Sequence, residues 1–225
     1  MVRRAIVLAL SVILALMVVA PLASAQSGEA RIGKLGATWW QWAGKPPTPT
    51  NHVVGSYSDK TAVGAIKCDG SNPSPAWFLA GTADGSVVTR HCTAPANTRI
   101  FFPVATFVCG PAWSDPYDTE SELRAECNSL MDAALAGATP YARVDGENVW
   151  MLRADTPAFV ATVPANNPFG VKGGTSISVA DGLWVLLPKG LPRGRHKIRF
   201  GGTFTNPFDP SVTYSQDNTY NLKIK

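Results

Sequence analysis

Charged residues are scarce in this sequence, and their signs nearly balance. Lys and Arg number 20 against 16 Asp and Glu, and charged residues make up 16% of the chain. When Arg3 and Arg4 of the N-terminal apolar segment are set aside, 18 basic and 16 acidic residues remain. A nucleic-acid-binding domain is usually strongly basic. We therefore expect no nucleic-acid partner.

Several catalytic and metal-binding motifs are also absent. The sequence contains no C-x-x-C pair and no G-x-S-x-G nucleophile elbow. Its three histidines, His52, His91 and His196, have no metal-ligand spacing. These absences disfavour a zinc site and a motif-based serine hydrolase, and we expect no cofactor.

The first 25 residues resemble a signal peptide. Arg3 and Arg4 precede an apolar run of about 16 residues, and Ala23-Ser24-Ala25 fits a signal-peptidase site before Gln26. A membrane-spanning helix needs roughly 20 apolar residues, so a retained anchor is the weaker alternative. No later apolar run is long enough to span a membrane. We expect a secreted or periplasmic protein with one domain, residues 26–225.

Four cysteines are consistent with export. An even number in an exported chain indicates disulfides. Three pairings are possible, and we favour Cys68–Cys92 with Cys109–Cys127 because each would link neighbouring segments.

Two helices are expected. Residues 28–43 place Ile32, Leu35, Trp39 and Trp42 on one face, and Trp40 then diverges from that face toward solvent. Residues 120–135 begin with a capping box of Thr119 and Glu122 and end at Gly137. Their apolar stripe contains Leu123, Cys127, Leu130 and Ala134.

The remaining pattern is typical of β-structure. Gly and Pro together number 38, which suits a turn-rich fold. Pro103 indicates an edge strand or a bulge, and Asp145-Gly146 indicates a hairpin turn. A second turn is expected at Asp181-Gly182. Strands are expected at 77–80, 86–91, 100–108, 141–144, 149–152, 158–163, 176–179, 183–187, 195–200 and 219–224. The fold class is therefore mainly β: an antiparallel β-sandwich, jelly-roll-like or immunoglobulin-like, with one or two accessory helices and disulfides.

Two features suggest ligand binding. Basic residues alternate from Arg193 through Arg195 and Lys197 to Arg199, so a strand would present all four on one face. His196, Ile198 and Phe200 would then face the core. The other feature is Trp40, which could stack on a sugar ring. The same patterns also fit a solvated edge strand and a helix packed on the sheet.

A set of short motifs carries a family resemblance. They are WWQW at 39–42, WFLAGT at 77–82, RHCT at 90–93, FFPV at 101–104, DGLWVLL at 181–187, GRHKIRFG at 194–201 and Val212-Thr213-Tyr214. Together they resemble a family of exported bacterial β-sandwich proteins with an N-terminal Trp-rich helix. The resemblance implies export and the sandwich fold. It implies no activity and no catalytic residues.

Three functions follow as hypotheses. The first is a non-catalytic module that binds an acidic or neutral polysaccharide through Trp40, the basic stripe, Arg90 and His91. The second is a polysaccharide hydrolase or lyase. A lyase would use His91 or Tyr141 as the base, with Arg90 or Arg153 neutralising the substrate carboxylate. A hydrolase would draw a carboxylate pair from Asp145, Asp155 and Asp181. The third is a self-assembling envelope protein.

A calcium site is a weaker expectation. Asp115, Asp118 and Glu120 gather oxygen ligands before and at the start of the second helix. The simpler interpretation is that acidic residues favour the positive end of a helix.

Overall fold

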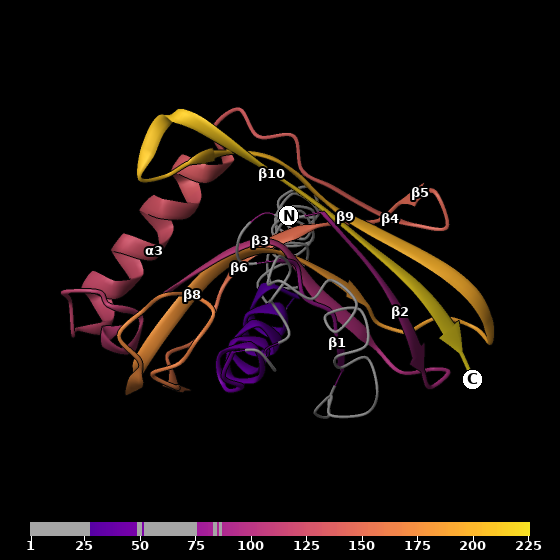
Figure 1. Ribbon diagram of the computed structural model, residues 1–225, viewed down its shortest axis with the longest axis horizontal. Helices are drawn as coiled ribbons and strands as arrows, with labels where there is room; N and C mark the ends of the chain where they lie inside the picture. The colour runs from indigo at the N-terminus through magenta and orange to yellow at the C-terminus, as the bar shows by residue number, and fades with distance from the viewer. Residues whose placement is uncertain (1–27, 49–50, 52–75, 83–84, 86) are drawn as a thin grey trace, which may run out of the picture.

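The described residues form two layered β-sheets, two α-helices and a short 3-10 helix, Pro111–Trp113. The computed structural model describes residues 28–48, 51, 76–82, 85 and 87–225. The N-terminal helix covers one face of one sheet, which we call sheet A, and the other sheet, sheet B, covers its opposite face (Figure 1). Among these residues no helix is long and apolar enough to cross a membrane. The expected signal peptide and Cys68 lie outside the described residues.

Sheet A has the strand order β1-β3-β8-β6, and β7 also pairs with β8. Its strands are β1 (Trp77–Phe78), β3 (Ile100–Cys109), β6 (Leu152–Asp155), β7 (Phe159–Val163) and β8 (Gly174–Leu187). The register of β3 against β8 shifts between Pro103 and Ala105. The bulge expected at Pro103 is confirmed. β1 pairs with β3 only at Ile100 and Phe101, so β8 is the only described strand that pairs with β3 at Pro103.

Sheet B has the order β2-β10-β9-β4-β5. Its strands are β2 (Val88–Ala94), β4 (Tyr141–Val144), β5 (Glu147–Asn148), β9 (Gly194–Asn206) and β10 (Asp209–Ile224). The pairs β1–β3 and β2–β10 are parallel, and the other pairs are antiparallel. The expected mainly β, sandwich-like fold is confirmed, with mixed sheets. The parallel pairs arise because the intervening segments cross between sheets.

The N-terminal helix runs through residues 28–44 of the described chain. Ile32, Leu35 and Trp39 are buried against sheet A, where Trp184 is a central contact. The ring centroids of Trp39 and Trp42 lie 6.0 Å apart, on the shared helix face that the sequence spacing predicts. The opposite face of sheet A packs on sheet B, and there the rings of Phe102 and Phe200 lie 4.5 Å apart.

Helix α3 (Glu120–Leu135) flanks the two sheets. The Thr119 side chain accepts the Glu122 backbone N–H at 3.4 Å, which confirms the predicted cap. The buried side chains of α3 are Leu123, Cys127, Met131 and Ala134. Met131 therefore takes the place in the apolar stripe that was expected of Leu130.

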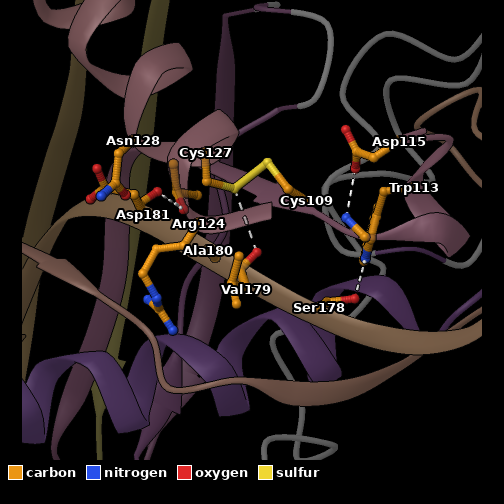
Figure 2. The surroundings of a disulfide bond; sticks show 12 residues. Cys109, Trp113, Asp115, Arg124, Cys127, Asn128, Ser178, Val179, Ala180 and Asp181 are labelled. Carbon is orange, nitrogen blue, oxygen red and sulfur yellow. Dashed lines mark hydrogen bonds between the residues drawn. A yellow bond between two sulfur atoms is a disulfide. The ribbon is translucent and has the colours of Figure 1, made fainter. Parts of the chain in front are cut away.

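A disulfide joins α3 to sheet A. Cys109 at the end of β3 bonds to Cys127, with 5.8 Å between their Cα atoms (Figure 2). This confirms one predicted pairing. Cys92 is also disulfide-bonded, and its expected partner, Cys68, lies outside the described residues.

Two turn predictions had different outcomes. Asp145 and Gly146 have φ values of 53° and 94° and join β4 to β5, as the hairpin motif predicts. The hairpin is shorter than expected, because β6 leaves it and joins sheet A. The turn at Asp181-Gly182 was a wrong prediction. Both residues lie within the continuous strand β8, where β3 and β6 pair with them on either side.

Candidate functional site

The outer face of sheet B presents the basic stripe. Arg195, Lys197 and Arg199 are exposed, while Ile198 and Phe200 are completely buried on the inner face. Arg193 is also exposed, just before β9 begins. The alternation read from the sequence is therefore confirmed. His196 points inward at the end of the strand, where its ring bonds to Asp145 at 2.7 Å and to the Pro192 carbonyl at 3.0 Å.

Neighbouring strands extend this basic surface. Lys223 of β10 lies opposite Arg195, and Arg143 of β4 lies opposite Arg199. Cross-strand partners share a face of the sheet, and both side chains are exposed. Sequence reasoning missed Lys223 and Arg143 because it does not reveal which strands lie beside β9.

His91 reaches the same surface from β2. Asn221 of β10 pairs with His91 on one side and with Lys197 on the other. The three residues therefore form one row across the sheet, and His91 is exposed. We call Arg143, Arg195, Lys197, Arg199 and Lys223 the cationic face, and His91 lies at its β2 edge.

Asp217 is an acidic residue on this same face of β10, and it is already paired. Asp217 accepts a 2.7 Å hydrogen bond from Arg199 and another of 2.7 Å from the Tyr141 hydroxyl. Burial and the bond to Asp217 raise the pKa of Tyr141 to about 12. Tyr141 therefore keeps its proton near neutral pH, which disfavours it as a catalytic base.

Arg90 does not belong to the cationic face. Its neighbour His91 points outward, so Arg90 points into the molecule and is only 4% exposed. Its guanidinium donates to the Ala80 carbonyl and to the Tyr220 hydroxyl, and it lies 5.4 Å from the Tyr220 ring centroid. Arg90 thus holds the chain at Ala80 against sheet B. The expectation that Arg90 and His91 act on one ligand is not supported by this geometry.

Trp40 is buried, and the expectation that it faces solvent was wrong. It is 6% exposed, and its indole N–H donates to the Thr106 hydroxyl at 3.1 Å. The centroid of the Trp40 ring lies 5.2 Å from that of Trp113 and 6.0 Å from that of Phe169. The segments that carry Trp113 and Phe169 cover a second side of the helix. Trp40 is consequently remote from the basic stripe that was expected to act with it.

The candidate carboxylates have structural partners. Asp155 and Asp181 are cross-strand neighbours, but the Asp181 side chain is only 1% exposed and bonds to Arg153. Burial raises the pKa of Asp181, and Arg153 offsets part of this effect. A substrate would not reach this carboxylate in the folded protein. Asp145 lies in the β4–β5 turn of sheet B, so it does not pair with Asp155 or Asp181 of sheet A.

The three calcium candidates do not assemble into a site. Asp115 accepts the Gly110 backbone N–H at 2.6 Å, and Glu120 pairs with Arg124 at 2.7 Å. Within the described part of the chain, no three His, Cys, Asp or Glu side chains gather closely enough to hold a metal ion.

Comparisons with known proteins add little to this geometry. No protein-family model matches the chain, and no curated protein matches it. One solved chain is similar, from "Structure of PbICP-C in complex with falcipain-2". The identity is 8% and the TM-score 0.24, and the match covers 66% of this chain and 98% of that chain. A likeness this low carries no argument about function.

Proposed function

We propose that this protein is an exported, non-catalytic module whose cationic face binds an acidic polysaccharide of the envelope or the extracellular medium. One observation carries the proposal: exposed basic side chains from three adjacent strands, β10, β9 and β4, gather on one face of sheet B. The disulfide between Cys109 and Cys127 supports the exported location.

The spacing of the charges suits a polymer. Alternate residues of a strand lie about 6.6 Å apart, and neighbouring strands about 4.8 Å apart. Both spacings are shorter than the Debye length of about 8 Å at physiological ionic strength, so neighbouring charges act together on an approaching anion. A repeating acidic chain can contact several of them at once, without needing a deep pocket.

A binding role is favoured over catalysis by the state of the candidate catalytic groups. Tyr141 has a raised pKa. The Asp181 carboxylate is buried and paired with Arg153, which also contacts Asp132 of α3. The family resemblance and export remain predictions, and both are compatible with a binding module.

The test is binding to acidic and neutral polysaccharides at low and high salt. We expect retention on polyuronates or sulfated glycans that fades as salt screens the charges. The double variant Arg195→Ala/Lys197→Ala should bind about tenfold more weakly, a loss of about 1.4 kcal/mol, and should show a shallower salt dependence.

The matched control is Lys34→Ala/Lys172→Ala. It removes the same charge from exposed positions on the N-terminal helix and on the loop before β8. It should bind like the unmodified protein. Equal binding by both double variants would reject the cationic face as the site. New reducing ends or unsaturated products would instead indicate an enzyme.

A further inference from the structure

A second feature of the fold is a cleft of about 400 Å³ between the N-terminal helix and the β9–β10 hairpin. This volume lies within the range of about 300–1,000 Å³ that is usual for small-molecule sites. The bulge of β3 contributes Pro103 to Thr106. Trp39 and Trp40 come from the helix, and the hairpin contributes Phe208, Tyr214 and Gln216.

Two details distinguish the cleft from a simple packing gap. Phe208 lies at the tip of the hairpin and is 77% exposed, although it is a large apolar side chain. The Tyr214 hydroxyl makes no hydrogen bond within the part of the chain that the structure describes. Burial raises the pKa of Tyr214, so this hydroxyl stays protonated and can both donate and accept.

The lining restricts the charge of the ligand. None of the described side chains that line the cleft carries a formal charge. An ionised ligand group placed there would lose its hydration without gaining a counter-ion, which is costly. The ligand should therefore be neutral where it enters the cleft.

The lining also indicates a ligand that is both apolar and polar. The indole N–H groups of Trp39 and Trp40 are bonded to the Leu79 carbonyl and the Thr106 hydroxyl, so their rings contribute mainly apolar surface. The Tyr214 hydroxyl and the Gln216 side chain, whose amide N–H donates to the Thr82 carbonyl at 3.4 Å, provide polar groups on the opposite side. A wholly apolar ligand would desolvate these polar groups without replacing their hydrogen bonds.

We infer that the cleft is a binding site for a neutral sugar residue. A sugar ring combines C–H faces, which pack on aromatic rings, with hydroxyl groups, which pair with amides and with a tyrosine. Tyr214 and Gln216 alternate along β10 with Ser215 and Asp217 of the outer face. The cleft and the cationic face are therefore on opposite faces of sheet B, and binding in the cleft does not require the basic residues.

The test is titration of the purified protein with neutral oligosaccharides of glucose, mannose and N-acetylglucosamine. Tryptophan fluorescence follows the titration because Trp39 and Trp40 line the cleft, and calorimetry confirms the affinity. We expect saturable binding of at least one series. Tyr214→Phe and Phe208→Ala should each weaken it by up to about tenfold, since each removes one contact while keeping the fold.

Two matched controls are Tyr117→Phe and Trp150→Ala. Tyr117 is 38% exposed and Trp150 81% exposed, and both lie outside the cleft. They should bind like the unmodified protein, as should Arg195→Ala/Lys197→Ala. The inference is overturned if no neutral oligosaccharide binds, or if Tyr214→Phe and Phe208→Ala both bind normally. It is also overturned if an anilinonaphthalene dye occupies the cleft and no sugar displaces it.

Discussion

Arg153 of β6 holds the buried carboxylate of Asp181 in the middle of β8. Its Nε and Nη2 atoms lie 2.9 and 2.5 Å from Asp181 Oδ2, and its Nη1 lies 2.5 Å from Asp132 of α3. The pair therefore connects two strands of sheet A to the flanking helix. Asp181 Oδ1 has no hydrogen-bond partner among the described residues, so Arg153 supplies the side-chain hydrogen bonds of this carboxylate.

Arg153→Gln should lower the free energy of unfolding by about 2–3 kcal/mol near neutral pH. It leaves a buried carboxylate without its cation, and partial exposure of Arg153 limits the loss. Because burial raises the folded pKa of Asp181 above the ordinary 3.8, the folded state binds the proton more tightly than the unfolded chain. The Asp181 contribution to stability thus rises as pH falls from the raised folded pKa toward 3.8. The stability lost in Arg153→Gln should therefore shrink in mild acid. Urea unfolding of both proteins at several pH values measures this difference in the free energy of unfolding.

The double variant Arg153→Gln/Asp181→Asn is the control for this prediction. It removes both charges and should recover most of the lost stability. A deficit that is independent of pH and is not recovered in the double variant would show that Arg153 acts through packing alone.

Removal of the Cys109–Cys127 disulfide should cost about 3 kcal/mol, since its cysteines are 18 residues apart. We expect Cys109→Ala/Cys127→Ala to lower the urea midpoint and to increase hydrogen exchange in α3. A cost below about 1 kcal/mol would mean that packing around Leu123 and Val179 is sufficient to hold the helix on sheet A.

Gly33→Ala and Gly28→Ala should have different effects on stability, although both add one methyl group to the same helix. A Cβ at Gly33 would lie 2.0 Å from the Asp155 carbonyl oxygen, so the helix would have to move away from sheet A. A Cβ at Gly28 would meet no atom within 4 Å from the described residues beyond its own helix backbone. We expect a loss of about 1–3 kcal/mol at position 33 and no loss at position 28. Thermal unfolding compares them, and equal effects would contradict the close helix–sheet contact.

Asp145→Asn tests the charge at the β4–β5 turn. Burial alone would raise the pKa of Asp145, but the Lys197 backbone N–H and the His196 ring lower it below 3.8. This contribution to stability is present above the ordinary aspartate pKa and is lost as pH falls through the folded value. Asn keeps the left-handed turn. We expect a loss below about 1 kcal/mol near neutral pH, because the site is half exposed, and none in strong acid.

Chemical or thermal unfolding at both pH values measures the Asp145 effect, with Glu147→Gln as the control. Glu147 is an exposed acid on the adjoining strand, so Glu147→Gln removes the same charge without these contacts. An equal loss in both variants, or a loss that persists in strong acid, would argue against the Asp145 interaction.

The candidate binding surface was only partly predictable. Alternation along β9 predicted that Arg195, Lys197 and Arg199 share a face, because side chains of any strand alternate. It could not identify Arg143 and Lys223 as their neighbours, since those come from strands far away in the sequence. It also could not show that Arg90 turns inward, because the strand boundary determines which residues face the core.

Local structure was predictable from the residues that form it. The helices at 28–44 and 120–135, the Thr119 cap and the Asp145-Gly146 turn all depend on residues within a few positions of one another. The burial of Trp40, the continuous strand at 174–187 and the pairing of Arg153 with Asp181 became visible only in the folded protein. These outcomes depend on contacts between segments distant in sequence, and such contacts override local preferences for turns and for exposure.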